Sequence, residues 1–195
     1  MPHPCEMPLG IAVDSQVGKV WYISTKQGVL GDYKLISKKF DKEVSIPIWS
    51  VRKNPIDFSN VWSLKVDRSR NSIWFTDEKQ NSIWRYTNSI GFNMYKIPEI
   101  SPAFGIISPV SLDLDPKGNV YFVGMHSSAL WFGNSTLMKN NTSDGIIKIP
   151  MPMNSLEGID SKRISIGSMT LDSKRNTIWI SVSALETQGE VCVII

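Results

Sequence analysis

The sequence has few of the residues that build metal centres and disulfide frameworks. It contains two cysteines and two histidines in 195 residues, and neither pair has the spacing of a zinc site. It also lacks the motifs of a serine-hydrolase elbow, a phosphate loop, an HExxH metal site and a CxxC pair. No short motif in these residues therefore identifies an active site, and function has to be argued from the fold and its loops.

Long apolar runs and a strong charge imbalance are also missing. No apolar run approaches the roughly 20 residues that span a bilayer, so we expect no membrane span. The first residues, MPHPCEMPLG, lack the basic start and apolar core of a secretory signal, which leaves cytoplasmic and extracytoplasmic locations open. The net charge is +3 with both signs interspersed. Nucleic-acid-binding surfaces concentrate basic residues on one face, so we expect no nucleic-acid partner.

What the sequence does contain is an internal repeat, clearest in VWSLKVDRSRNSIWFTDEKQNSIWRY at residues 61–86. Each copy opens with two apolar residues that are separated by one residue, and an aspartate directly follows the second of them. The four aspartates lie 53, 48 and 57 residues apart: Asp14, Asp67, Asp115 and Asp172. A repeat of about this length indicates a fold made of tandem structural units.

A polar turn and an aromatic, β-branched run follow each aspartate. The turns are SQVGK, RSRNS, PKGN and SKRNT, and the runs are VWYI, IWFT, VYFV and IWIS. Strand-forming residues on both sides of a turn predict an antiparallel hairpin. A third apolar run follows a longer loop in each copy: DYKLI, SIWRY, ALWFG and EVCVI.

Three of the four copies have a fourth run that carries the dipeptide Ile-Pro, at residues 46–47, 97–98 and 149–150. Proline cannot donate to a strand ladder, so it belongs on an edge strand. A tandem four-stranded antiparallel unit with proline on its outermost strand is typical of a β-propeller blade. We therefore predict an all-β fold and one propeller domain over residues 1–195, with blades at about 7–50, 60–99, 108–152 and 166–195. A β-sandwich is the alternative, but it would not require the repeat.

The last copy is incomplete, because its Ile-Pro strand should fall near residue 200 and the sequence ends at Ile195. An exposed ladder over residues 190–195 would be an aggregation-prone sheet edge. This favours about four blades of a larger propeller. A domain-swapped or oligomeric ring is the alternative.

Candidate site residues lie in the loops between the second and third strands of each blade. In a propeller these loops share a face with the blade-to-blade loops, and that face opens on the central channel. The candidates are Asp77, Glu78, Lys79, His126 and Glu186. Their side chains would suit a small-molecule or peptide-like ligand, or Mg²⁺ or Ca²⁺ held by Asp77 and Glu78. The alternative is that these five side chains are ordinary solvated loop residues without a ligand.

His126 is the one loop histidine of the repeat, and it would serve as a general base if a carboxylate lay nearby. We predict that Glu78 and His126 point toward the same channel mouth from adjacent blades. This pair is the candidate catalytic set.

Two stretches, PLGIAVDSQVGKVWYIS and NSIWFTDEKQNSIWRY, resemble the repeats of streptogramin B lyases, the virginiamycin B lyase-like propellers. The resemblance covers all four copies, although NHL and SMP-30-like propellers share much of the pattern. It implies a seven-bladed ring and a magnesium-assisted carbon–oxygen lyase that opens a cyclic depsipeptide lactone. That elimination needs a base for the α-proton and a cation for the developing enolate charge.

The family pattern carries over only in part. Its catalytic blade has a glutamate four residues after the second-strand tryptophan, and Glu78 matches this position relative to Trp74. The same blade has a proline-histidine-glycine step entering the first strand, and here the histidine position is Trp62. The other copies have Leu9, Val110 and Gly167 there.

Three hypotheses follow. The first is an enzyme of the lyase family whose base lies in further blades that these 195 residues do not include. The second is a non-catalytic propeller that binds a ligand or a protein on its loop face, with Asp77, Lys79, Trp62 and Glu186 as binding residues. The third is an SMP-30-like metal-dependent lactonase, which would need a cluster of channel-lining carboxylates.

Overall fold

The computed structural model describes residues 8–47, 60–98, 107–125, 127, 129–151, 164–184 and 190–194. These residues form fifteen β-strands and one short 3₁₀ turn, Arg68–Arg70, and they contain no α-helix. No helix in the described part of the chain is long and apolar enough to cross a membrane. The prediction of an all-β fold is confirmed.

The strands form four antiparallel sheets, each made of strands that follow one another along the chain. The first sheet contains β1 (Pro8–Asp14), β2 (Lys19–Ser24), β3 (Val29–Lys34) and β4 (Lys39–Ser45). The second contains β5 (Leu64–Asp67), β6 (Ser72–Asp77), β7 (Ser82–Thr87) and β8 (Gly91–Lys96). The third contains β9 (Pro109–Leu114), β10 (Val120–Gly124), β11 (Ala129–Gly133) and β12 (Ile146–Pro150). The fourth has three described strands, β13 (Ile164–Asp172), β14 (Thr177–Ala184) and β15 (Glu190–Ile194).

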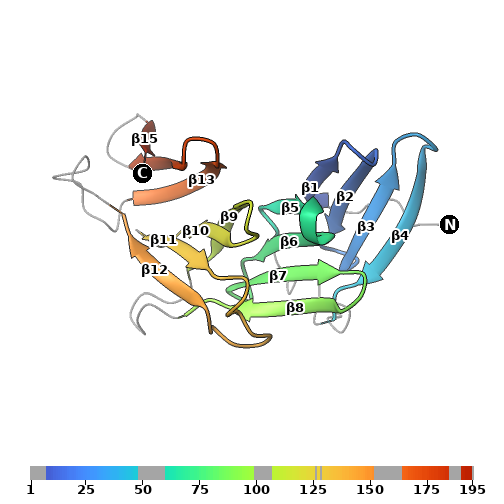
Figure 1. The fold of residues 1–195 in the computed structure, drawn as a ribbon, viewed down its shortest axis with the longest axis horizontal. Coiled ribbons are helices and arrows are strands. Elements are labelled where there is room, and N and C mark those ends of the chain that lie inside the picture. Colours follow the sequence, from blue (N-terminus) through green and yellow to red (C-terminus); the bar gives the residue numbers. More distant parts are fainter. Residues whose placement is uncertain are drawn as a thin grey trace.

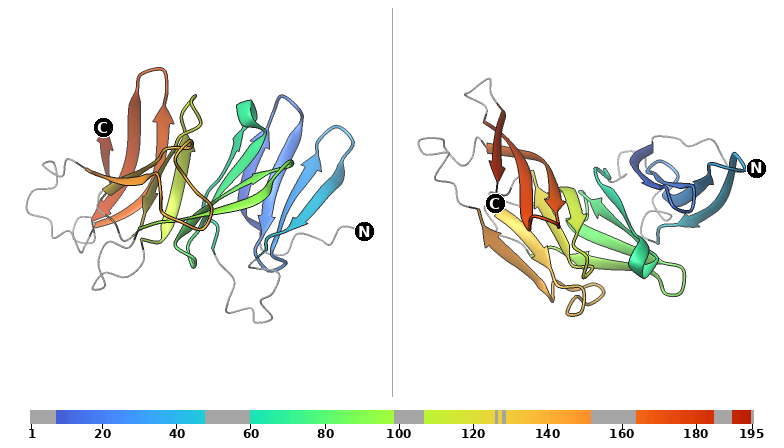
Figure 2. Two further views of the ribbon diagram at one scale, coloured as in Figure 1. Left: turned by 60° about the horizontal axis from the view of Figure 1, so that its bottom comes forward. Right: turned by 45° about the horizontal axis from the view of Figure 1, so that its top comes forward.

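The four sheets follow one another around an arc, from the first sheet in blue to the fourth in red (Figure 1). The first strand of each sheet lies on the inside of the arc, and these inner strands contact those of the neighbouring sheets. The fourth strands β4, β8 and β12 lie on the outside, and the turned views show the sheets stacked side by side (Figure 2). This is the arrangement of blades in a β-propeller.

The turn between the first and second strands of each blade uses the same backbone device. Each turn has a residue in the left-handed conformation at or next to its end, with φ of 63° at Gly18, 47° at Asn71, 82° at Gly118 and 52° at Asn176. Glycine and asparagine are the residues that adopt this conformation at least cost. The turns SQVGK, RSRNS, PKGN and SKRNT therefore share a left-handed glycine or asparagine, although their sequences differ.

The hydrophobic core is divided among the three junctions between blades. Trp21, Ile23 and Leu30 of the first blade pack against Phe75 and Trp84 of the second. The Phe75 and Trp84 rings are stacked, with centroids 6.0 Å apart. Equivalent clusters fill the junction of the second and third blades and that of the third and fourth. Each middle blade therefore buries both of its faces.

The predicted place of the Ile-Pro pairs is wrong for two blades. Ile46–Pro47 and Ile97–Pro98 follow β4 and β8 directly instead of lying in them, and only Ile149–Pro150 falls within a fourth strand, β12. The isoleucine N–H groups continue the register one residue past the strand ends: Ile46 donates to the Gly28 carbonyl (2.8 Å) and Ile97 to that of Asn81 (3.1 Å). The isoleucine of these two pairs is a buried anchor that ends the strand.

Candidate functional site

The clearest polar constellation on the loop face is a corner formed by Trp62 and Glu78. The Trp62 indole Nε1 donates to Glu78 Oε2 at 2.7 Å, and Asn60 Nδ2 donates to the same oxygen at 2.9 Å. The Glu78 backbone N–H donates to the Asn60 carbonyl at 3.1 Å. These bonds fix the carboxylate against the indole, whose residue is 50% exposed.

The chain path around Thr76 places Trp62 at this corner. Both Trp62 N–H and Ser63 N–H donate to Thr76 Oγ1 at 3.2 Å, so a side-chain hydroxyl replaces a ladder partner. Pairing of β5 with β6 begins only at Leu64 and Phe75. Because the ladder starts late, the residues just before it are free to turn toward the end of β6, where Glu78 follows.

Asp77 lies in the same loop but faces the blade interior. It is fully buried, and its carboxylate accepts from the Gln80 backbone N–H at 3.0 Å and from Trp84 Nε1 at 3.2 Å. Bonds of this kind close a turn around an aspartate. Lys79 is exposed on the turn between Asp77 and Gln80. The structure therefore separates the two neighbouring carboxylates, Asp77 inward and Glu78 at the corner.

Two predicted site residues, His126 and Glu186, lie outside the described residues. The shared channel mouth of Glu78 and His126 therefore stays a prediction. No group of three His, Cys, Asp or Glu residues in the described chain is placed to hold a metal ion. At Glu78 the Oε2 atom faces two N–H donors. Such an environment does not fit a cation at that oxygen, since donor hydrogens carry positive partial charge.

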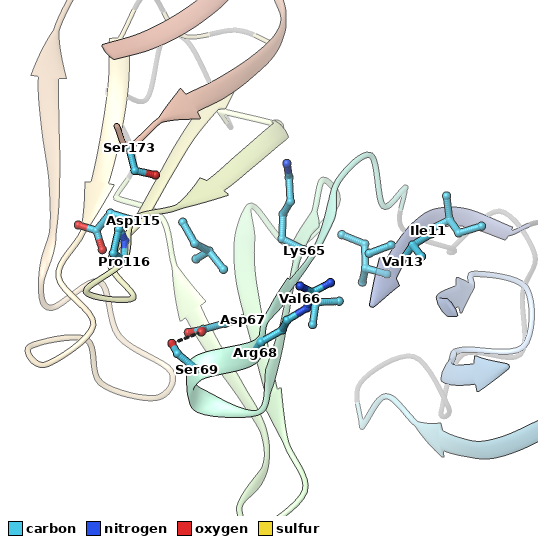
Figure 3. A pocket seen from close by; sticks show the side chains of 13 residues that line it. Ile11, Val13, Lys65, Val66, Asp67, Arg68, Ser69, Asp115, Pro116 and Ser173 are labelled. Carbon is cyan, nitrogen blue, oxygen red and sulfur yellow. Dashed lines mark hydrogen bonds between the residues drawn. The ribbon is translucent and has the colours of Figure 1, made fainter. Parts of the chain in front are cut away.

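A cavity of about 670 Å³ lies at the other end of the inner strands, where each strand runs into its aspartate turn (Figure 3). It is lined by the ends of β1, β5 and β9 and by the turns that follow β5, β9 and β13. Its labelled lining residues include Ile11, Val13, Lys65, Arg68, Ser69, Asp115, Pro116 and Ser173. The sequence does not predict this cavity, because its lining comes from turns of separate blades that no local pattern brings together.

The two basic residues of the cavity wall, Lys65 and Arg68, form ion pairs with carboxylates beside the cavity. Arg68 Nε lies 2.8 Å from Asp14 Oδ1, and Lys65 Nζ lies 3.5 Å from Asp113 Oδ1. Both pairs join neighbouring blades. The cavity therefore combines apolar strand ends with ion pairs that help to hold the blades in register.

Among the described groups, clearly displaced pKa values occur away from the Trp62–Glu78 corner. Burial of the Tyr95 phenol between the second and third blades raises its pKa, against the opposing effect of the Arg85 charge. Burial lowers the pKa of Lys19, but bonding to Asp32 and Asp41 outweighs this and raises the pKa overall. These displacements mark blade packing and surface ion pairs, and none identifies an acid or a base at the corner.

No family model and no curated protein matches the sequence. Solved structures do match. The virginiamycin B lyase from Staphylococcus aureus aligns at 20% identity with a TM-score of 0.64, covering 96% of this chain and 55% of that one. A catalytically inactive variant of that lyase, solved with quinupristin, aligns at 19% identity with a TM-score of 0.67, covering 100% and 57%.

A propeller from another context matches as well. The β-propeller domain of Cps50 (Swd1) from Myceliophteria thermophila aligns at 13% identity with a TM-score of 0.64, covering 98% of this chain and 54% of that one. The chain has a lyase-like β-propeller fold. It spans about half the length of the solved structures it matches. At these identities the likeness establishes the fold, and the activity has to be argued from the site.

Proposed function

We propose that this chain is part of a lyase-like propeller that binds a peptide-like small molecule at the Trp62–Glu78 corner without catalysing its cleavage there. One observation carries the proposal. Where the lyase pattern has its histidine, Trp62 donates a 2.7 Å hydrogen bond to Glu78, which stands at the position of the family glutamate. An indole N–H is a donor only, so it cannot take a proton from a substrate.

The corner offers two kinds of contact to a ligand. The half-exposed indole of Trp62 presents an apolar ring with one polar edge, a combination that suits binding surfaces. The Glu78 carboxylate is held in place by Trp62 and Asn60 through Oε2. A peptide-like molecule would lay an apolar group on the ring and direct an N–H donor to the carboxylate.

A carbon–oxygen lyase is the second candidate, favoured by the fold and by the place of Glu78 four residues after Trp74. In such an enzyme Mg²⁺ would stabilise the enolate charge, and a base such as His126 would take the α-proton. Glu78 would then orient the substrate rather than act as the base.

The test is a fluorescence titration with quinupristin, the compound solved with the inactive lyase variant. The protein would be titrated with and without Mg²⁺. We expect saturable quenching that weakens at least tenfold in Trp62→Phe and in Glu78→Gln. Trp179→Phe is the matched control, because this tryptophan is similarly exposed but lies on the fourth blade. Absence of quenching in the unmodified protein would contradict the proposal.

The same samples separate binding from lyase activity. Elimination opens a lactone ring without changing its mass, so the product has to be followed by chromatographic retention and fragmentation. We expect only intact quinupristin after incubation. A linear isomer that requires Mg²⁺ and disappears in Glu78→Gln would establish the lyase instead.

A further inference from the structure

A second cavity, of about 240 Å³, lies between the first and second blades, near the turns that follow the repeat aspartates. The first blade contributes Trp21 of β2 and Val17 of the turn before this strand. The second blade contributes Ile73 of β6 and Tyr86 of β7. Both walls belong to sheets that pack on each other through one hydrophobic cluster. We name this space the junction cavity.

Two polar contacts between the blades lie on either side of the junction cavity. Near the inner strands, Arg68 Nε of the second blade lies 2.8 Å from Asp14 Oδ1 of the first. Near the outer strands, Lys42 Nζ of the first blade donates to Tyr86 Oη at 2.6 Å and to Asn88 Oδ1 at 2.9 Å. The cavity is therefore a gap between two fixed contacts, and not a place where the blades come apart.

A difference between two equivalent turns leaves this gap open. Val17 and Arg70 are each the third residue after the aspartate of their turn, and the two turns have the same length. At the junction of the second and third blades, Arg70 Nη2 donates to the Lys117 carbonyl, and the guanidinium lies directly against Gly118. Val17 is too short to make the corresponding contact with the second blade. The first junction therefore lacks the side chain that bridges the turns of the second junction.

A carboxylate in the cavity wall has room for a hydrogen-bond donor. Asp14 is 7% exposed, and its recorded contact among the described residues is the ion pair with Arg68 Nε. This pair lacks the alignment of a hydrogen bond, so Oδ1 accepts none from the described residues. Buried carboxylate oxygens are costly to leave without donors. Asp14 therefore offers the cavity an acceptor for an O–H or N–H group.

Hydrogen-bond donors line the same cavity. Asn88 Oδ1 accepts from Lys42 Nζ at 2.9 Å and from Tyr86 Oη at 3.0 Å, so the amide oxygen is directed to the protein. The NH₂ group of this amide can then donate to a ligand. Trp21 adds the edge of an indole, whose N–H is a donor only. The cavity therefore combines an acceptor with donors.

The formal charges of the cavity wall have partners. Lys19 Nζ lies 3.0 Å from Asp32 Oδ2 and 3.4 Å from Asp41 Oδ2. Arg68 is paired with Asp14. A charged ligand would have to compete with these pairs, whereas a neutral one leaves them intact. The wall therefore favours a neutral ligand that both donates and accepts hydrogen bonds.

We propose that the junction cavity binds one neutral sugar ring. Each sugar hydroxyl donates and accepts, which matches the Asp14 carboxylate and the Asn88 amide. The C–H groups of the ring would contact the apolar wall beside Trp21. The volume of about 240 Å³ suits one ring and not a longer chain. This site lies at the other end of the blades from the Trp62–Glu78 corner, so it is independent of the function proposed there.

The test is a saturation-transfer NMR titration of the full chain with the methyl glycosides of glucose, galactose and mannose and with N-acetylglucosamine. Inorganic phosphate is the charged probe. We expect saturable binding of at least one sugar at millimolar concentration, as for a ligand of about a dozen non-hydrogen atoms, and none of phosphate. Val17→Arg should fill the cavity and weaken sugar binding at least tenfold. Leu137→Arg is the matched control, because Leu137 and Val17 are both 59% exposed and Leu137 lies on the third blade.

A second variant keeps the test valid if the new arginine disturbs the turn. Asn88→Asp keeps the oxygen that accepts from Lys42 and removes only the NH₂ donor, so it should weaken sugar binding roughly tenfold. Asn134→Asp is its control, since Asn134 Oδ1 likewise accepts two bonds, both from Thr136, at a distant turn. Binding of none of the four sugars, sugar binding that neither Val17→Arg nor Asn88→Asp weakens, or binding of phosphate in place of sugar would overturn the proposal.

Discussion

The indole nitrogen of Trp62 lies 2.7 Å from Oε2 of Glu78, so a hydrogen-bond donor fills the place at which the lyase pattern has a base. Together with the Asn60 amide, the indole occupies Oε2 with N–H donors, which disfavours a cation at that oxygen. A β-propeller blade thus holds a tryptophan and a carboxylate together at the end of its second strand. The adjoining Asp77 takes no part in this corner, and that difference can be tested directly.

Asp77 and Glu78 should separate stability from binding. Asp77→Asn should lower the free energy of unfolding by about 1–3 kcal/mol, because the buried carboxylate accepts from Trp84 Nε1 and the Gln80 N–H. Glu78→Gln should cost less than about 1 kcal/mol at its more exposed site, yet weaken quinupristin binding. Urea unfolding and fluorescence titration measure the two effects. Equal losses of stability would show that both carboxylates are structural.

The Ser111 hydroxyl, which accepts from Met169 N–H at 3.0 Å and donates to the Met169 carbonyl at 3.3 Å, should contribute to stability. Ser111→Ala should destabilise the protein by about 1–3 kcal/mol, because the buried Met169 N–H and C=O lose their shared partner. Ser173→Ala, at an exposed turn position, should change the unfolding free energy by less than about 0.5 kcal/mol. Urea denaturation of both variants checks this. A Ser111→Ala protein as stable as the control would show that the hydrogen bonds between Ser111 and Met169 contribute no net stability.

Gly124 should tolerate no side chain. A Cβ at this position would lie 2.1 Å from Ile107 Cγ2 and 2.4 Å from the Ile107 carbonyl oxygen. Gly124→Ala should therefore destabilise by about 1–3 kcal/mol through overpacking. Gly167→Ala is the control, since its nearest contact is the Ser181 hydroxyl at 3.1 Å and the residue is exposed. Thermal unfolding compares the pair, and similar melting temperatures would contradict the close packing at Gly124.

Tyr95 should make the protein less stable in alkali. Burial raises the pKa of its phenol above the ordinary value in the folded state. The unfolded chain then loses this proton first, so stability is full below the ordinary tyrosine pKa of about 10 and falls as pH rises toward the folded value. Tyr95→Phe should remove this part of the decline. The test is to measure the unfolding free energies of the unmodified protein and of Tyr95→Phe between roughly pH 8 and 11, where the phenol titrates.

The repeat made the strands and turns predictable. It did not predict which way individual side chains point or which residues they contact. Alternation before Asp67 and the turn residue Asn71 are local signals, so they identified β5, β6 and their hairpin. The inward turn of Asp77 depends on Trp84, which comes from the next strand. The Ser111 hydroxyl accepts a hydrogen bond from the backbone of Met169, 58 residues later in the chain. Contacts over such separations depend on how blades stack, which no local pattern specifies.

The division of the core among three junctions also bears on how the protein unfolds. Each blade exchanges contacts only with its neighbours, so stability is distributed along the arc as in a one-dimensional array. The second and third sheets, which bury both faces, should therefore be slow to open. Amide hydrogen exchange would then be slow in β6 and β10, the second strands of these two sheets.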